Sequence, residues 1–231
     1  MFNYLKQKLF SLPATNRKLL LYGLQRSGTN YLESLVKLNY PSCRFMNGEL
    51  RNDILHKHFR LYDDKQIIPE PQFLNQLRFK SFTDFESSLP APPDLYLVIS
   101  KDPYSWFVSY EKWSHKNNWP SHAYHYIEEY NLFYGKWMEF SKQTKKILFI
   151  RYIDLLQQPL SEMNKIGNVL NLPEQHQLKT TKKVYASRKF TGAKKEEFLQ
   201  QEHLKKISAE DFTLINEKLN KELLGFLRYE W

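Results

Sequence analysis

The chain has 231 residues, of which 42% are hydrophobic and 26% are charged. These values are typical of soluble globular proteins and exclude a disordered or fibrous chain. Lys and Arg outnumber Asp and Glu by 34 to 25, and the net charge of +9 favours anionic partners: nucleic acid, an anionic membrane surface or a polyanionic small molecule. The length predicts one domain over residues 1–231, with residues 1–17 as an N-terminal extension.

The cysteine content and the hydropathy pattern indicate a cytoplasmic protein. Cys43 is the only cysteine, which excludes an intrachain disulfide and a cysteine-rich zinc site. The sequence contains no signal-peptide pattern and no run of roughly 18 apolar residues, the length that a membrane-spanning helix needs. We therefore expect a reducing, cytoplasmic location, with at most a peripheral membrane contact through the basic and apolar start.

Short apolar runs, each bounded by polar or turn-forming residues, are typical of β-strands. They predict strands over residues 19–22, 53–56, 95–99 and 147–150, with helical patterns between and after them. Strands that alternate with helices predict an α/β fold, in which helices flank a mostly parallel central sheet.

Further along the chain, two helix starts have capping signals. Asp102 and Pro103 match an N-cap followed by proline at the first helical position. Ser208 heads a predicted C-terminal helix that extends to Leu223. Residues 174–206, which are rich in Lys, Gln and Glu, are expected to form a mobile segment that closes over the cofactor or substrate.

The segment after the first predicted strand has the pattern of an anion-binding loop. Gly23 and Gly28 let the backbone curl around a ligand, and the start of the following helix offers unpaired N–H groups and a positive dipole end. Arg26 adds a full positive charge. Three neighbours add polar side chains: Ser27, Thr29 and Asn30. An ordinary strand-to-helix turn with a capping threonine is the alternative.

This loop differs from a Walker A sequence, because Thr29 follows Gly28 where a Walker loop has lysine. Walker loops combine lysine with Mg²⁺ to offset the several negative charges of a transferring phosphoryl group. A sulfuryl group carries one negative charge, so arginine and backbone donors can serve it without a metal. The missing lysine therefore argues against a phosphoryl-transfer loop and is compatible with a group of lower charge that needs no metal.

Residues 25–31 resemble the 5′-phosphosulfate loop of sulfotransferases that use 3′-phosphoadenosine 5′-phosphosulfate (PAPS). Residues 97–103 resemble the 3′-phosphate segment of this family, in which a basic residue and a serine eight positions later hold the phosphate; here they are Lys101 and Ser109. Residues 150–159 and 212–216 are similar to the next strand and helix and to the C-terminal helix of the family. The similar segments span roughly residues 19–230.

The resemblance to bacterial-type members implies the P-loop-like sulfotransferase fold and transfer of SO₃ from PAPS to an acceptor hydroxyl or amine, which leaves adenosine 3′,5′-bisphosphate. It implies no metal. It also implies a set of cofactor-binding residues: Gln25, Arg26, Ser27, Gly28, Thr29, Asn30, Tyr31, Lys101, Ser109 and Arg188.

Three of these residues depart from the family pattern. Lys101 replaces the usual arginine, which keeps the charge and loses the two-pronged fork. Tyr31 replaces a common tryptophan and offers an aromatic face near adenine. Arg188 belongs to residues 187–192, which only loosely resemble the basic loop that closes over the 3′-phosphate.

Sulfuryl transfer needs a base that removes the acceptor proton. His56, Lys57 and His58 follow the second predicted strand, and ligands collect at the carboxyl ends of parallel strands. Strand alternation puts both histidines on one face. Members of the family often carry a histidine base here, so the resemblance implies His58 as the base, with Arg26 and Lys57 also catalytic. Other candidate bases are His56, Glu33 and Glu49, and solvated histidines at a polar strand end are the alternative. The remaining histidines are expected at the surface: His115, His122, His125, His176 and His203.

The acceptor is expected to be a carbohydrate hydroxyl on a saccharide or glycoconjugate, because aromatic rings can stack on sugars. Most aromatic residues are expected in the core, and Trp119 with Pro120 is expected nearest the substrate. Two other functions stay open. A P-loop nucleotide or small-molecule kinase is disfavoured by the missing lysine, and a basic nucleic-acid-binding module by the absence of a helix-turn-helix or finger signature. We expect no nucleic-acid partner.

Overall fold

The computed structural model describes residues 16–50, 53–61, 79–117, 126–180, 183–185, 188–189 and 192–229. Several predictions fall outside these residues: those on the N-terminal extension up to residue 15, on Trp119 and Pro120, on His122 and His125, and on residues 187, 190 and 191.

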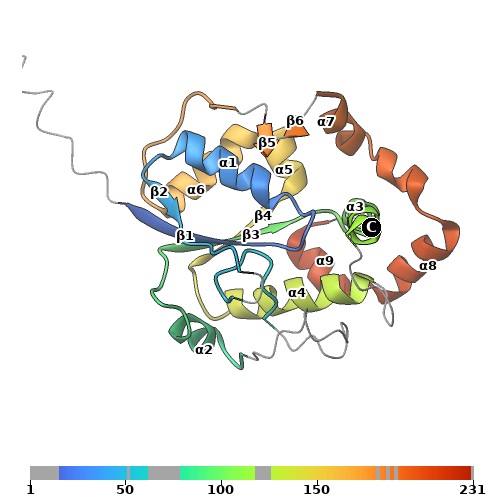
Figure 1. Ribbon diagram of the computed structural model, residues 1–231, viewed down its shortest axis with the longest axis horizontal. Coiled ribbons are helices and arrows are strands. Elements are labelled where there is room, and N and C mark those ends of the chain that lie inside the picture. The colour runs from blue at the N-terminus through green and yellow to red at the C-terminus, as the bar shows by residue number, and fades with distance from the viewer. Residues whose placement is uncertain are drawn as a thin grey trace, which may run out of the picture.

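A parallel four-stranded sheet forms the centre of the described part of the chain (Figure 1). Its order is β2-β1-β3-β4, with β2 at Cys43–Phe45, β1 at Arg17–Tyr22, β3 at Leu95–Ser100 and β4 at Ile147–Arg151. A separate antiparallel pair consists of β5 (Lys183–Tyr185) and β6 (Arg188–Lys189). The predicted α/β class with a parallel central sheet is confirmed.

Helices cover both faces of this sheet (Figure 1). One core contains the side chains of Leu19 and Leu21 and packs against α1, α5 and α6. The other contains Leu20 and Tyr22 and packs against α2, α3, α4, α8 and α9. Successive side chains of a strand point to opposite faces, so β1 contributes alternately to both cores. The helices run as follows: α1 Thr29–Asn39, α2 Phe82–Ser87, α3 Pro103–Lys116, α4 Tyr126–Ser141, α5 Tyr152–Gln157, α6 Pro159–Val169, α7 Gly192–Leu199, the 3₁₀ helix η3 Glu202–Lys206, α8 Ala209–Lys218 and α9 Lys221–Leu227.

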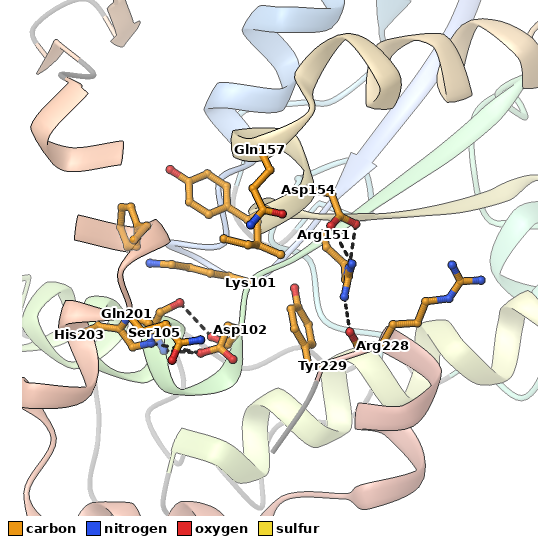
Figure 2. Close-up of a pocket in the computed structure, with 13 residues that line it drawn as sticks. Lys101, Asp102, Ser105, Arg151, Asp154, Gln157, Gln201, His203, Arg228 and Tyr229 are labelled. Carbon is orange, nitrogen blue, oxygen red and sulfur yellow. Dashed lines mark hydrogen bonds and ion pairs between the residues drawn. The ribbon is translucent and has the colours of Figure 1, made fainter. Parts of the chain in front are cut away.

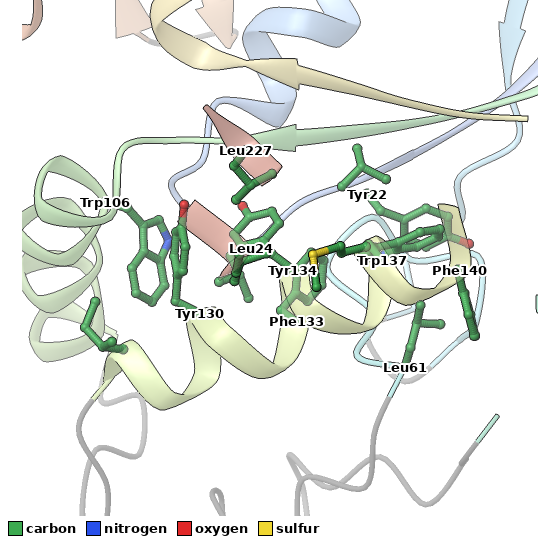
Figure 3. Packing of buried hydrophobic residues seen from close by; sticks show 14 of the residues in the cluster. Tyr22, Leu24, Leu61, Trp106, Tyr130, Phe133, Tyr134, Trp137, Phe140 and Leu227 are labelled. Atoms are coloured by element: carbon green, nitrogen blue, oxygen red, sulfur yellow. The ribbon is translucent and has the colours of Figure 1, made fainter. Parts of the chain in front are cut away.

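Long apolar side chains of α4 fill the second core. Figure 3 shows Trp137 beside Tyr22 of β1, and the two ring centroids lie 4.7 Å apart. Phe133 and Phe140 are also buried there. This packing fixes α4 beneath the sheet. Within the described residues, no helix is long and apolar enough to cross a membrane.

The predicted strand over residues 53–56 is wrong. These residues form turns, and β2 occupies the edge of the sheet instead. The Asp53 carboxylate accepts a hydrogen bond from the Leu55 N–H at 2.8 Å, and the Asp53 carbonyl accepts one from the His56 N–H at 2.8 Å. An aspartate that binds nearby backbone groups in this way favours a turn over a strand.

Both predicted helix starts are confirmed. Asp102 caps α3 by accepting a hydrogen bond from the Ser105 N–H, and Ser208 caps α8 by accepting one from the Asp211 N–H. The predicted C-terminal helix, however, is divided in two. Asn220 caps a second helix, α9, because its side chain accepts a hydrogen bond from the Leu223 N–H.

The Asn47 side chain extends the pairing of β1 beyond the short strand β2. Its Oδ1 accepts a hydrogen bond from the Leu21 N–H at 2.9 Å, and its Nδ2 donates to the Leu21 carbonyl at 3.0 Å. The same Nδ2 donates to the Leu55 carbonyl at 2.9 Å. One side chain therefore attaches the turns of residues 53–58 to the end of β1.

We expect Asn47→Ala to lower the free energy of unfolding by about 1–3 kcal/mol, because three backbone groups lose a partner in a partly buried position. Chemical denaturation measures this change. Asn168→Ala, at an exposed position on α6, is the control and should change stability by less than about 0.5 kcal/mol. Equal effects of the two substitutions would contradict the role given to Asn47.

Candidate functional site

The loop between β1 and α1 follows the carboxyl end of a central strand. The Leu24 carbonyl accepts a hydrogen bond from the Ser27 N–H at 3.1 Å, which closes a tight turn. Arg26 is exposed at this turn with φ 73°, and Gly28 has φ 103°. Gly28 is the N-cap of α1, and no side chain caps this helix. The Tyr31 N–H donates to the Gly28 carbonyl at 3.0 Å, whereas the Thr29 and Asn30 N–H groups precede the first hydrogen bonds of the helix. Thr29 lies inside the helix without capping it.

Glycine is required at two positions of this loop. A Cβ atom on Gly28 would lie 2.4 Å from the Tyr152 ring, and one on Gly23 would lie 2.6 Å from the Ser27 Oγ and 2.8 Å from the Ile99 carbonyl oxygen. Real Cβ atoms do not approach so closely. The loop can therefore lie tightly against β3 and α5 only with glycine at these positions.

Gln25 carries a buried amide group that has no hydrogen-bond partner in the part of the chain that the structure describes. The residue is 4% exposed, and neither Oε1 nor Nε2 has a hydrogen-bond partner among the described residues. Its backbone carbonyl accepts a hydrogen bond from Trp106 Nε1 at 2.9 Å. An unsatisfied buried amide is costly. A polar ligand in the loop would satisfy it, so the loop fits the polyanionic group that its sequence pattern implies.

Lys101 and Ser109 lie together, as the resemblance to the 3′-phosphate segment implies. Lys101 directly follows β3 and is buried, and its Nζ donates a hydrogen bond to Ser109 Oγ at 2.7 Å. The Nζ also lies 4.1 Å from the ring centroid of Phe198 and 5.7 Å from that of Tyr152. Aromatic faces attract a cation in such positions. The Lys101 ammonium group therefore places a positive charge at the carboxyl end of β3, where it can bind an anion.

Tyr152 links this cation to the loop after β1. Its ring lies against Gly28 and contacts Tyr31 edge to face, with centroids 6.3 Å apart. It also meets Phe198 edge to face at 5.5 Å. Burial raises the pKa of the Tyr152 hydroxyl well above its usual value, so the group stays neutral. Sequence reasoning missed this residue, although a tyrosine directly after a predicted strand was the available signal.

A pocket of about 250 Å³ lies beside Lys101 (Figure 2). Arg151 reaches its wall from the end of β4, pairs with Asp154 through two hydrogen bonds of 2.7 Å and donates to the Arg228 carbonyl. The pocket is thus built from the residues directly after β3, the start of α3, the end of β4, α5, the α7–η3 segment and the residues after α9. Sequence reasoning did not find it, since residues far apart in the chain line it.

His203 also lines this pocket, which corrects the prediction that it lies at the surface. It is 8% exposed, and its Nε2 lies 3.5 Å from Asp102 Oδ1. The burial arises because η3 packs against α3, a contact without a local sequence signal. His115 and His176 are exposed, as predicted.

The turn that carries His56, Lys57 and His58 lies against the start of the loop. The Gly23 N–H donates to the Lys57 carbonyl at 3.0 Å, and the Gly23 carbonyl oxygen lies 2.6 Å from His58 Nδ1. The carbonyl can only accept, so Nδ1 carries the proton and Nε2 keeps a free lone pair. Although no strand forms here, the rings of His56 and His58 still meet edge to face, with centroids 5.3 Å apart.

Burial lowers the pKa of His58 from 6.5 to about 3, although the hydrogen bond to Gly23 opposes this change. The positive charges of Lys57 and Arg60 lower it further. The ring is therefore neutral at pH 7, which is the form that can accept a proton.

Lys57 links this turn to α1. Its Nζ donates to Asn30 Oδ1 at 2.5 Å and to Glu33 Oε2 at 3.3 Å. Lys37 donates to the other Glu33 oxygen at 2.6 Å. Burial raises the pKa of Glu33, but the bonds and charges of Lys37 and Lys57 outweigh it and leave the pKa below its usual value. Glu33 is thus an ionised partner of two lysines, and Glu49, another candidate base, is exposed.

The remaining predicted residue, Arg188, lies in β6, and its side chain is outside the described part of the structure. The other strand of this pair, β5, lies against α1. The structure thus brings together residues 23–31, His56, Lys57 and His58 through hydrogen bonds. It brings Lys101 together with Ser109, and Tyr152 connects the two groups.

A family model and a solved structure are similar to this chain. Residues 16–221 match the family model of the sulfotransferase domain. A crystal structure of a sulfotransferase from Alicyclobacillus acidocaldarius aligns with 94% of this chain and 97% of that chain, at 9% sequence identity and a TM-score of 0.44. No curated protein sequence matches the chain.

Acid should destabilise the protein in part through His58. Its pKa is lower in the folded chain than in the unfolded chain, so the unfolded chain binds more protons between pH 6.5 and about 3. Stability from the neutral ring is complete above pH 6.5 and is lost as the pH falls toward 3. Lowering the pH from 7 to 5 should cost the wild type about 1–2 kcal/mol more than it costs His58→Gln.

Urea denaturation at the two pH values measures this difference. His115→Gln, which changes an exposed histidine on α3, should keep the wild-type dependence on pH. The same pH dependence in His58→Gln and the wild type would show that the His58 ring is not held neutral by the fold.

Proposed function

The chain belongs to the sulfotransferase family, and we propose that it moves a sulfuryl group from PAPS to an acceptor hydroxyl or amine. One observation carries the choice of donor: two anion-binding groups stand at the ends of neighbouring strands. The loop of residues 23–28 follows β1, the Lys101–Ser109 pair follows β3, and β1 pairs with β3. A nucleotide with a phosphate group on either side of its ribose matches two such groups.

In this proposal the loop binds the 5′ end of the donor. The loop contributes the Thr29 and Asn30 N–H groups, the Arg26 guanidinium and the Gln25 amide, which has no hydrogen-bond partner among the described residues. PAPS, when bound, supplies an activated sulfuryl group on its 5′-phosphate. Donors already aimed at a site where negative charge grows stabilise it without reorganisation. The loop would therefore act both in binding and in catalysis.

Lys101 and Ser109 would hold the 3′-phosphate. The pocket beside Lys101 has the aromatic side chains of Tyr152 and Phe198 in its wall, so it suits the adjoining nucleoside. Tyr31, which contacts Tyr152, lies on the loop side of this wall. A nucleotide without a 3′-phosphate lacks the group that Lys101 and Ser109 bind in this proposal, which supports discrimination against ATP.

His58 would act as the base. Its Nδ1–H is bound to the Gly23 carbonyl, so Nε2 is the atom that accepts the acceptor proton. The ring is neutral at pH 7 and can accept a proton. The negative charge of a donor bound beside it would raise its pKa toward the range of an effective base. Lys57, held by Asn30 and Glu33, would keep a positive charge between the base and the loop, where it offsets the negative charge of the transferring group.

We extend the proposal to a hydroxyl of a saccharide or glycoconjugate as the acceptor. The fully buried rings of Trp106 and Trp137 fill the core and are not available for stacking on a sugar. Trp113, which is partly buried, is the described tryptophan with some exposed surface. Stacking of this kind suits the flat apolar face of a pyranose ring.

Adenosine 3′,5′-bisphosphate should bind more tightly than adenosine 5′-monophosphate, in buffer with EDTA. Lys101→Met should remove most of this preference, roughly a 10- to 100-fold change in Kd, because a charged hydrogen bond contributes about 1.5–3 kcal/mol. Isothermal titration calorimetry measures both constants. Lys112→Met, at an exposed position on α3, is the matched control. Equal affinity of the wild type for both nucleotides would remove the role proposed for Lys101 and Ser109.

Turnover should be found when the protein and ³⁵S-labelled PAPS meet a panel of saccharides, phenols and peptides, with the saccharides as the best acceptors. His58→Ala should lower kcat by roughly 10²- to 10⁴-fold, the usual range for a general base, and leave affinity for the bisphosphate nearly unchanged. Arg26→Ala should weaken both.

His115→Ala serves as the control for the loss of a histidine. If His58→Ala keeps its activity while His56→Ala or Glu33→Ala does not, the base is assigned to the wrong residue. Transfer to no acceptor at all would contradict the proposed reaction.

A further inference from the structure

A fully buried carboxylate on α4 is not explained by donor binding or by proton transfer. The side chain of Glu129 is 0% exposed, and that of its partner Arg60 is 5% exposed. Arg60 Nε donates to Glu129 Oε1 at 2.8 Å, and Arg60 Nη2 donates to the same oxygen. Glu129 Oε2 accepts a hydrogen bond from the Tyr110 hydroxyl at 2.8 Å. Removing two charges from water costs free energy even when they are paired. Stability alone therefore does not explain this ion pair.

Arg60, one partner of Glu129, lies close in the chain to His58, the proposed base. Arg60 follows His58 by two positions, and the residue between them, Phe59, is buried in the core. The Phe59 N–H donates to the His56 carbonyl at 2.9 Å. A backbone held so closely on one side of His58 leaves little freedom for its ring. The position of Arg60 therefore restrains the backbone position of His58.

Tyr110, the other partner of Glu129, is connected through Trp106 to the loop of residues 23–28. The Tyr110 ring stacks on Trp106, with centroids 4.6 Å apart and planes at 20°. Trp106 Nε1 donates to the Gln25 carbonyl in the loop. His58 in turn donates to the Gly23 carbonyl. The contacts therefore form a closed circuit, which runs from Glu129 through Arg60 and His58 to the loop, and from the loop through Trp106 and Tyr110 back to Glu129.

The same helix also holds the end of β3. The Tyr130 hydroxyl donates to the Lys101 carbonyl at 2.9 Å, and the Tyr134 hydroxyl donates to the Ile99 carbonyl at 3.0 Å. On α4, Glu129 thus contacts Arg60 and Tyr110, which lead to His58 and to the loop. Tyr130 and Tyr134 contact the end of β3, next to Lys101.

We propose that Glu129 is a positioning residue, which through Arg60 and Tyr110 sets the His58 ring relative to the loop of residues 23–28. This proposal rests on the proposed function, because it concerns the base of that reaction. It predicts that the ion pair matters more for turnover than for stability or for donor binding.

Stability and positioning can be separated by replacing both charges. Apolar side chains of similar size in place of a buried ion pair often leave stability unchanged or higher, whereas removal of one partner leaves an uncompensated charge. The double variant Glu129→Leu with Arg60→Met is therefore the informative one. The control is Glu128→Leu with Lys218→Met, which removes an exposed ion pair on the same helix.

In the Glu129/Arg60 double variant, we expect a melting temperature and a Kd for adenosine 3′,5′-bisphosphate close to the wild type. Its kcat should fall about 10- to 100-fold, because small displacements of a catalytic group have effects of this size. NMR of ¹⁵N-labelled histidine should show the Nδ1–H form of His58 in the wild type and in the control, and a mixture of tautomers in the double variant.

Wild-type kcat and an unchanged His58 tautomer in the double variant would overturn the proposal. If the double variant does not fold, Tyr110→Phe decides, because it removes one hydrogen bond and keeps the ring stack. It should lower kcat several-fold and shift the His58 resonances, and wild-type values of both would overturn the proposal. If the wild type transfers sulfuryl groups to no acceptor, the proposed function fails, and the NMR result alone decides whether Glu129 positions His58.

Discussion

The buried ion pair between Glu129 and Arg60 is the interaction on which the geometry of the site depends. Glu129 has no access to solvent, so its two oxygens must be satisfied by protein groups, and the fold meets this need with the guanidinium of Arg60 and the hydroxyl of Tyr110. These partners come from the turn that carries His58 and from α3. A single electrostatic requirement therefore brings three separate segments of the chain into contact beneath the sheet.

Charge and close packing arrange the rest of the site. Gly28 allows the loop to lie against Tyr152, and Tyr152 in turn lies within 5.7 Å of the Lys101 ammonium. The two proposed anion-binding groups thus share one aromatic side chain. His58, the proposed base, contacts the start of the loop, where the Gly23 carbonyl sets its tautomer. The loop therefore contacts both Tyr152 and His58, so that a movement of the loop would affect both.

Local patterns made much of this structure predictable. The runs that became β1, β3 and β4 are short and apolar, and β1 and β3 contribute side chains to both cores. Lys101 and Ser109 were found through the resemblance to the 3′-phosphate segment of the family, and the structure brings them together at a strand end and the helix after it. The strand at 53–56 was predicted wrongly because Ile54 and Leu55 pack against the core from a turn that Asp53 stabilises. β2 is only three residues long, too short for a recognisable pattern. Glu129 and Arg60 are 69 positions apart, so no local pattern relates them, and the burial of His203 depends on a packing contact of the same kind.

A crystal structure with adenosine 3′,5′-bisphosphate tests the central claim most directly, namely that the loop after β1 and the Lys101–Ser109 pair hold the two ends of one donor. The account predicts the 5′-phosphate at the first turn of α1, next to Arg26, and the 3′-phosphate within hydrogen-bond distance of Lys101 Nζ and Ser109 Oγ. A nucleotide bound away from both groups, or bound with its phosphates in the opposite order, would contradict it.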